Sequence, residues 1–377
     1  MVLMALDHVR DFFTNATFDP LDLTKTSAPL FMTRWITHFC APVFTFLAGT
    51  GAFLALTRGK TKRELAWFLL TRGLWLAVLE VTWVRCLGWE FNFDFHTLGV
   101  GTLWSIGWSM VVLSALVFLP TWAVTTFGVA MIVLHNAFDW VTPGSLGSFG
   151  WAWAVLHVSQ PLDFAPGFRF AVGYPLIPWI GVVAAGYGFG EILLLEPVKR
   201  RRWIRTLGLG MTLVFLLLRF SKLYGNSFYG SSREWSVQGN FLFTIFSFID
   251  CHKYPPSLLY LLMTLGPALI ALSFLDRGTP RVLRPFLVFG RVPLFYYLLH
   301  LPLIHALAVL VAYVRFGHAE WLFVSPFVQP IPPPAGNGFG LPVVYLLWIA
   351  VVLSLYPVCR WFAEVKRRRR EAWLSYL

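Results

Sequence analysis

Long apolar runs separated by short basic clusters recur along this sequence, and they constrain its fold more than any other feature. A helix that crosses a bilayer needs about 20 predominantly apolar residues. Hydrophobic residues make up 57% of the chain and charged residues 13%, whereas roughly a quarter of a typical soluble domain is charged. A compact soluble fold could not bury this much apolar surface. The sequence therefore predicts an integral membrane protein that crosses the bilayer many times.

We predict an all-α polytopic transmembrane bundle of about ten spans. No soluble domain, linker or clear repeat separates the apolar runs, so residues 1–377 are expected to form a single membrane domain. The predicted spans are 1–13, 35–57, 65–85, 102–119, 121–137, 172–194, 203–220, 256–275, 292–314 and 342–362.

The basic residues predict the orientation of the bundle. They form four clusters, at 58–63, 199–205, 277–284 and 366–370. These clusters follow the second, sixth, eighth and tenth spans, so all four fall on one side if every span crosses once. The positive-inside rule assigns that side, and with it both termini, to the cytoplasm. We therefore interpret the net charge of +12 as a sign of topology rather than of nucleic-acid binding.

The first predicted span, residues 1–13, is unusually short. No Lys or Arg precedes its apolar residues, so it lacks both a cytoplasmic anchor and the basic region that begins a secretory signal. We expect that the chain as given begins inside its first helix. On this interpretation, Asp7 and His8 lie in the outer half of the membrane.

Ionisable residues within a span are costly, and by default they mark a functional site or a buried pair. In the first span, Asp7 and Arg10 are three residues apart and could neutralise each other on one helix face. Alternatively, a carboxylate could orient His8 as a general base. Because adjacent helical residues point about 100° apart, we expect the partner of His8 to come from another span.

Two other spans carry histidines near their outer ends. His38 lies about one turn from the outer surface in the second span, and Pro42 leaves the carbonyl of His38 without its helical donor. His38 is either a structural hydrogen-bonding residue or part of a site. His135 and Asp139 are four residues apart at the end of the fifth span, and we expect a local cap there.

Further candidates lie in and before the last spans. Arg291 is placed at the cytoplasmic end of the ninth span, where it could extend to the interface or bind a phosphate. His300 follows near mid-depth. Lys253 and Tyr254 lie where the outer loop enters the eighth span, and they either face an outer vestibule or have a structural role.

The cysteines give no metal or redox motif. Cys40, Cys86, Cys251 and Cys359 show no CxxC spacing. Cys86 and Cys251 both fall near outer segments, so one disulfide is possible, but the sequence cannot pair them. The chain has no phosphate-binding glycine loop, HExxH or GxSxG motif, so nothing supports an ATPase, a protease or a soluble hydrolase.

Motifs spread over the whole chain resemble a family of bacterial membrane proteins. This family is related to the catalytic region of heparan-alpha-glucosaminide N-acetyltransferase, within a broad group of transmembrane acyltransferases. The motifs are M4-A-L-D-H-V-R-D-F-F13, H38-F-C-A-P-V-F-T-F-L-A-G49, Y174-P-L-I-P-W179, K253-Y-P-P-S257, G290-R-V-P-L-F-Y-Y-L-L-H300, L355-Y-P-V-C-R-W-F362 and L374-S-Y-L377.

The resemblance implies a multi-pass protein of the bacterial inner membrane that works with acetyl-CoA or another acyl-CoA from the cytosol. The implied acceptor is an envelope carbohydrate or similar molecule on the outer side, and a histidine would act as general base or carry the acyl group. We expect neither a metal nor a nucleic-acid partner. The candidate catalytic residues are His8, Asp7 and His38, and the candidate substrate-binding residues are Arg291, His300, Lys253 and Tyr254.

Two features limit this transfer of function. Family members usually begin with an Arg–Gly pair just upstream of the first motif, and in this chain that arginine would lie before Met1. The heparan enzyme's key histidine lies in its first lumenal loop, whereas residues 14–33 contain no histidine. A membrane transporter that uses the same polar residues as a substrate or proton path is the alternative, followed by a non-catalytic membrane partner or sensor. The acceptor, the acyl group and the oligomeric state stay open.

Overall fold

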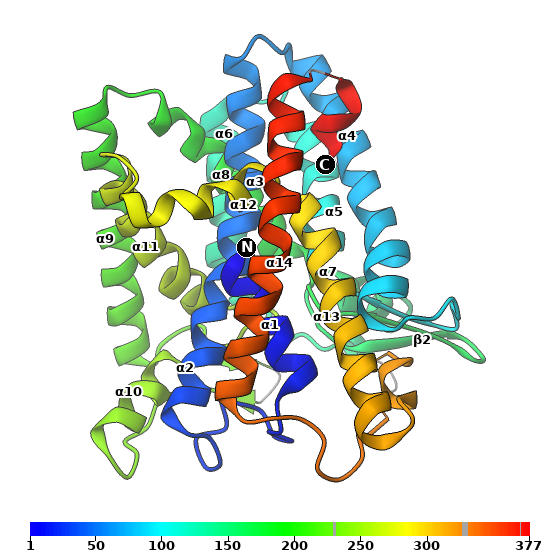
Figure 1. Ribbon diagram of the computed structural model, residues 1–377. Helices are drawn as coiled ribbons and strands as arrows, with labels where there is room; N and C mark the ends of the chain where they lie inside the picture. Colours follow the sequence, from blue (N-terminus) through cyan, green and yellow to red (C-terminus); the bar gives the residue numbers. More distant parts are fainter. Residues whose placement is uncertain (229–230, 326–330, 370) are drawn as a thin grey trace.

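A computed structural model describes residues 1–228, 231–325, 331–369 and 371–377. Its helices run mostly along one common direction and form a bundle (Figure 1). The α-helices are α1 (Val2–Phe13), α2 (Ala28–Ile36), α3 (Cys40–Thr57), α4 (Lys62–Leu79), α5 (Thr102–Leu116), α6 (Thr121–Leu134), α7 (Gly150–Leu156), α8 (Leu176–Leu193), α9 (Pro197–Ser221), α10 (Phe241–Ile249), α11 (Leu258–Leu275), α12 (Leu287–Arg291), α13 (Pro293–Phe316) and α14 (Leu341–Arg368).

Short helical segments and strands connect these helices. The short segments are η1 (Thr37–Phe39), the π-helical η2 (Glu80–Trp89), η3 (His135–Phe138), η4 (Pro143–Phe149), η5 (Arg281–Phe286), η6 (Glu320–Leu322) and η7 (Ala372–Tyr376). The strands are β1 (Thr97–Val100), β2 (Pro161–Ala165), β3 (Phe168–Val172), β4 (Ser227–Phe228) and β5 (Ser231–Ser232).

The all-α polytopic prediction is confirmed, since helices occupy all ten predicted positions. In the described part of the chain, 8 helical stretches are long and apolar enough to cross a membrane. Three of them are composite, because α2 continues through η1 into α3, α4 continues into η2 and α6 continues into η3. The two predicted spans outside this set correspond to α1, with 12 residues, and α5, with 15 residues.

Local sequence signals explain where individual helices begin and end. Helix α4 starts at a capping box, in which the side chains of Thr61 and Glu64 each bond the other's backbone N–H. Helix α13 starts at Pro293, which has no N–H to satisfy. The same helix stops at Gly317, whose φ of 77° is a left-handed conformation that glycine adopts readily.

Helices α3 and α8 cross in direct backbone contact. A Cβ atom at Gly49 would lie 1.9 Å from the carbonyl oxygen of Val183, and one at Gly186 would lie 2.1 Å from that of Phe46. The Thr50 hydroxyl donates a hydrogen bond of 2.9 Å to the Gly186 carbonyl. Small residues and hydroxyl bonds of this kind are typical of helix contacts within membranes.

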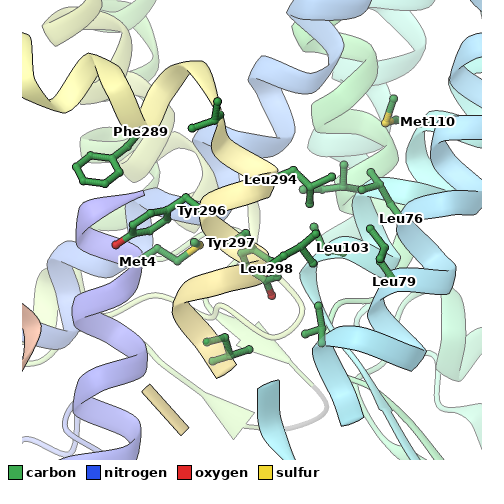
Figure 2. Close-up of a cluster of buried hydrophobic side chains, with 14 of the residues drawn as sticks. Met4, Leu76, Leu79, Leu103, Met110, Phe289, Leu294, Tyr296, Tyr297 and Leu298 are labelled. Carbon is green, nitrogen blue, oxygen red and sulfur yellow. The ribbon is translucent and has the colours of Figure 1, made fainter. Parts of the chain in front are cut away.

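Two large hydrophobic cores fill the bundle, and a third, small cluster joins Leu21, Phe31 and Phe246. One combines α1, α4, α5, α13 and α14, and Figure 2 shows part of it, with Met4 of α1 facing Tyr296 of α13. The other is built around α8, α9 and α11. Helix α1 therefore packs between the long helices α13 and α14, and the indole of Trp348 donates a 2.8 Å hydrogen bond to the Val2 carbonyl.

The two ends of the bundle differ in charge and complexity. The basic end, uppermost in Figure 1, carries the loops after α3, α8, α11 and α14, and Arg200 pairs with Asp276 there at 3.0 Å. Arg370 of the fourth basic cluster lies outside the described residues. The loop-rich end carries the long connections, including a three-stranded sheet in the order β1-β3-β2. The positive-inside rule predicts that the basic end faces the cytoplasm.

The sheet was not predicted from the sequence. Strand β1 pairs in parallel with β3, with Thr97 opposite Arg169, and β2 and β3 form an antiparallel hairpin. All four cysteines are free in the structure. The Cys86–Cys251 disulfide that the sequence left open is therefore not formed.

Candidate functional site

Helix α1 directs Asp7 and Arg10 toward α2. The Arg10 guanidinium donates to the Asp7 carboxylate at 2.7 Å, which confirms the predicted pairing of these two residues. Arg34 of α2 adds two bonds to the same carboxylate, at 2.8 and 2.7 Å. Arg10 also bonds Asp11 at 2.7 Å. We call Asp7, Arg10, Asp11 and Arg34 the ion cluster.

The adjacent residue, His8, points to a different face of α1. Its ring lies 5.2 Å from the ring of His300 on α13, centroid to centroid, and 5.1 Å from that of Trp89 at the end of η2. The ring of Tyr296 stacks on His300 at 5.0 Å, with 8° between the planes. We call His8, Trp89, Tyr296 and His300 the histidine stack. The ring contacts of His8 thus come from other helical segments, whereas the bonding partner that we expected from another span stays a prediction.

The hydrogen bonds of His300 define its tautomer. Its Nδ1 atom lies 3.0 Å from the carbonyl oxygen of Tyr296 and 2.8 Å from that of Tyr297. Carbonyl oxygens only accept hydrogen bonds, so Nδ1 carries the proton and Nε2 of the neutral ring keeps a lone pair. This Nε2 atom is buried and has no hydrogen-bond partner in the described part of the chain.

Two more polar atoms of the histidine stack are unsatisfied. The Nδ1 atom of His8 and the hydroxyl of Tyr296 are buried, and neither has a hydrogen-bond partner among the described residues. Buried polar atoms are nearly always paired, so an unpaired one calls for an explanation such as a catalytic role or an unseen solute. Three unpaired polar atoms in one contact group therefore mark the histidine stack as a candidate site.

Lys253 and Tyr254 lie beside the ion cluster, in the loop that precedes α11. Lys253 is only 8% exposed, and its ammonium lies 5.1 Å above the ring of Tyr254. Burial acts to raise the pKa of the Tyr254 phenol, but the positive charges of Lys253 and Arg34 outweigh it, so the pKa lies below its usual value. Because Tyr254 is 41% exposed, it is accessible to a solute.

His38 lies in η1, between α2 and α3, and is completely buried. Tyr260 of α11 donates a 2.8 Å hydrogen bond to the His38 carbonyl, the one that Pro42 leaves without a helical donor. Neither ring nitrogen of His38 has a hydrogen-bond partner within the described ranges. The centroid of its ring lies 5.4 Å from that of Tyr260, so His38 packs against α11.

Arg291 ends α12, immediately before α13 begins. Its side chain is exposed, and none of the ion pairs found between described residues involves it. The guanidinium is therefore free to bind an anion. Helix α13 thus runs from an exposed arginine just before its start to the buried His300.

A second group of buried polar residues lies at the loop-rich end. The ring nitrogens of His135 lie 2.8 Å from the Ile132 carbonyl and 3.0 Å from the Pro256 carbonyl. Asp139 accepts from Asn136 at 2.8 Å and contacts His157 at 3.0 Å. The Asn136 amide oxygen accepts from the Leu258 N–H at the start of α11. We call His135, Asn136, Asp139 and His157 the loop-end cluster.

The loop-end cluster refines one sequence prediction. A local cap was expected from His135 and Asp139, and both do bond close to the end of α6. However, the His135 and Asp139 side chains do not bond each other. The cluster instead caps α11, because the Asn136 amide oxygen accepts from the N–H of Leu258. No group of three or more His, Cys, Asp or Glu side chains in the described ranges is arranged to hold a metal ion.

The sequence did not single out three residues of the site. Arg34 precedes His38 by one helical turn, so its position in an apolar segment could have flagged it. Tyr296 lies four residues before His300 on the same helix face, a spacing that was visible within the quoted motif. Nothing in the sequence connects Trp89 to α1.

Comparison with known proteins identifies the family of the chain. The sequence model of a family described as heparan-alpha-glucosaminide N-acetyltransferase, catalytic, matches residues 1–221. This stretch exceeds half of the chain and includes the ion cluster, His8 and His38, but not α13. A search of curated proteins gave no match.

Proposed function

Because the chain belongs to the family of the heparan-alpha-glucosaminide N-acetyltransferase catalytic region, we propose that it transfers an acyl group to a carbohydrate-type acceptor. The donor is acetyl-CoA or another acyl-CoA, which approaches from the basic end. The acceptor approaches from the loop-rich end. The protein would work in the inner membrane of a bacterium, with its basic end in the cytoplasm.

The histidine stack is the observation that carries this proposal. His8 and His300 each carry an unsatisfied imidazole nitrogen, and the centroids of their rings lie 5.2 Å apart inside the bundle. The exposed Arg291 precedes α13, on the side of that helix toward the basic end (Figure 1), while Lys253 and Tyr254 lie near the ion cluster. A site between two substrates that arrive from opposite ends needs such an arrangement.

The residues present fit an acyl-CoA donor. The unpaired guanidinium of Arg291 suits a phosphate group, for which arginine offers several donors. Apolar helices surround the unsatisfied atoms of His8, Tyr296 and His300, and this setting suits a neutral thioester. When bound, the donor would supply an activated acyl carbon.

We assign the role of general base to His8. His8 would take the proton from the acceptor amine or hydroxyl as the new bond to the acyl carbon forms. His300, whose Nε2 keeps a lone pair, would accept that proton from His8. His38 is a second candidate base, on the α11 side of the bundle.

Asp7 is better described as a positioning residue than as the partner of a catalytic base. Its carboxylate oxygens bind Arg10 and Arg34, and in the structure they do not orient His8. The ion cluster ties α1 to α2 and thereby fixes the rotation of α1 that turns His8 toward α13. Lys253 and Tyr254 are proposed to contact the acceptor.

The test is acyl transfer by the purified protein in liposomes. Radiolabelled acetyl-CoA is supplied outside and glucosamine, as an amino-sugar probe, is enclosed inside. We expect labelled N-acetylglucosamine, and we expect His8→Ala to lower the rate by roughly 10² to 10⁴-fold, the usual contribution of a general base. His96→Ala is the matched control, because His96 is exposed and pairs with the nearby Asp94.

Each outcome has a defined meaning. Full activity of His8→Ala would overturn the role of His8 while leaving the class of enzyme intact. A wild-type protein that neither binds acetyl-CoA nor labels a sugar amine or hydroxyl would overturn the proposed function. Entry of glucosamine into liposomes without any acyl donor would favour the transporter.

A further inference from the structure

The hydroxyl of Tyr296 is the least explained polar group in the histidine stack. Tyr296 is completely buried, and its hydroxyl has no hydrogen-bond partner within the described ranges. Leaving a buried hydroxyl unpaired costs about 1 to 3 kcal/mol. A phenylalanine would fill the same space without that cost, so packing alone does not account for a tyrosine here.

The aromatic neighbours of Tyr296 hold its ring but do not use its hydroxyl. One face stacks on His300, and the ring of Phe289 on α12 contacts it edge-on at 4.9 Å. Figure 2 shows Tyr296 reaching from α13 toward α1, with its oxygen on the side of Met4. The ring is therefore fixed while its polar tip is free to bind a group that enters between α13 and α1.

The position of Tyr296 along α13 suggests what that group is. Tyr296 precedes His300 by one turn, which places it about 6 Å nearer the start of the helix. Arg291, at the basic end of α13, comes before both residues. A donor held at Arg291, with its acyl carbon near His8 and His300, would therefore have its sulfur side toward Tyr296.

We propose that Tyr296 is a catalytic acid whose hydroxyl donates a proton to the sulfur of the departing thiol. This inference rests on the proposed function and adds the residue that completes it. The proposed base accounts for the proton removed from the acceptor. It does not account for the negative charge that develops on sulfur inside an apolar site, where an unpaired charge is especially costly.

The proton balance closes within the histidine stack. The bond between the acceptor nitrogen or oxygen and the acyl carbon forms as the carbon–sulfur bond breaks. His8 gains the acceptor's proton, and Tyr296 gives its own proton to sulfur, so that the free thiol leaves. The proton on His8 then passes by way of His300 to the phenolate of Tyr296, which restores the starting state.

The neighbouring Tyr297 provides a matched control. It lies on the same helical turn and its ring also contacts His300, at 5.4 Å. Unlike that of Tyr296, its hydroxyl is not among the buried atoms without a partner. We therefore compare the removal of the hydroxyl from Tyr296 with its removal from Tyr297. An effect seen only at Tyr296 indicates a catalytic hydroxyl, whereas equal effects indicate a general change in the surroundings of His300.

The experiment compares Tyr296→Phe and Tyr297→Phe with two acyl donors, acetyl-CoA and an S-acetyl aryl thioester whose thiol is far more acidic. An acidic thiol leaves without being protonated. We expect Tyr296→Phe to lower kcat roughly 10²-fold with acetyl-CoA and to have little effect with the aryl thioester. Tyr297→Phe should change neither rate. By calorimetry, Tyr296→Phe should bind acetyl-CoA with a Kd no higher than that of the wild type. Its Tm should be no lower than that of the wild type.

The outcomes separate this inference from the proposed function. Equal losses with both donors, no loss with either, or the same pattern in Tyr297→Phe would overturn the role of Tyr296 while leaving acyl transfer intact. A large fall in Tm for Tyr296→Phe would also contradict it, because the hydroxyl would then have a structural partner. A wild-type protein that transfers from neither donor would overturn the proposed function, and this inference with it.

Discussion

The histidine stack and the loop-end cluster both bury histidines, but they differ in how their polar atoms are satisfied. In the loop-end cluster, each ring nitrogen of His135 faces a carbonyl oxygen, to one of which a neutral ring donates, while Asn136 and Asp139 bond each other, the N–H of Leu258 and His157. In the histidine stack, His8, His300 and Tyr296 each leave one buried polar atom without a partner among the described residues.

This difference suggests which of the two regions stabilises the fold and which takes part in catalysis. A buried polar group with its partners in place stabilises one conformation, and removing one partner exposes the full desolvation cost of the other. A buried polar group without a partner contributes no such stability, so its presence is better explained by a solute that it meets. We therefore expect changes in the two regions to affect different measurements.

The largest effect on stability should come from Asp7→Asn. This variant tests whether Asp7, although it is adjacent to His8 in the sequence, stabilises the fold through its ion pairs. The change leaves Arg10 and Arg34 without their shared carboxylate, and breaking a buried ion pair costs about 3 to 5 kcal/mol. Reversible unfolding in a detergent titration would measure the loss. Asp22→Asn is the control, because Asp22 forms an exposed pair with Lys25 at 3.5 Å, worth about 0 to 1 kcal/mol. Equal losses in the two variants would contradict the assignment.

The next largest effect should be on the rate, in His300→Asn. An asparagine amide can still donate to the carbonyls that now bind Nδ1, but it offers nothing in place of Nε2. We expect kcat to fall roughly 10²-fold, about 2.7 kcal/mol in activation free energy, with little change in Tm. Steady-state kinetics and thermal unfolding test this together, with the exposed His318 changed to Asn as control. A variant that unfolds easily but is fully active when folded would show that His300 is structural.

A smaller effect on stability should follow from His157→Phe in the loop-end cluster. The change preserves an aromatic ring beside Trp153, whose ring lies 4.6 Å away, but removes a hydrogen-bond partner of Asp139. We expect the free energy of unfolding to fall by roughly 1 to 3 kcal/mol, while kcat per folded molecule stays unchanged. Loss of activity without loss of stability would place this cluster in the chemistry.

The smallest effect should be electrostatic. The positive charge of Lys253 lowers the pKa of the Tyr254 phenol, so Lys253→Met should raise that pKa. Absorbance titration of tyrosinate, with Tyr254→Phe to identify the signal, measures the change. Lys222→Met is the matched control, since Lys222 lies over the ring of Trp235 at 5.4 Å. An unchanged or lowered pKa in Lys253→Met would show that this ammonium does not act on Tyr254.

Much of the fold follows from the sequence because the membrane imposes it. Spans must be long and apolar, and this constraint located helices at every predicted position. Errors arose where tertiary pairing decides the structure. Strands β1 and β3 lie about 70 residues apart, so their pairing leaves no local signal. Helix α2 begins at Ala28, ahead of the predicted start at residue 35, because Pro29 suits a first turn.

In the candidate site, too, local features could be predicted from the sequence, whereas contacts between distant segments could not. The Asp7–Arg10 pair could be predicted because both residues lie on one helix at a fixed spacing. The spacing also indicated that His8 points away from Asp7. It did not indicate which residues His8 faces. The contact between His8 and His300 joins opposite ends of the chain, and only the packing of α1 against α13 reveals it. Likewise, whether a nitrogen or hydroxyl lacks a partner depends on every neighbouring element.

The most direct test compares His8→Ala with His157→Phe in one preparation, measuring labelled acetyl transfer to glucosamine and Tm for each. The account predicts that His8→Ala loses transfer but keeps its Tm, and that His157→Phe loses stability but keeps its rate per folded molecule. If His8→Ala lost stability while keeping its rate, and His157→Phe lost only its rate, the unpaired atoms of the histidine stack would not mark the site, and the account would be wrong.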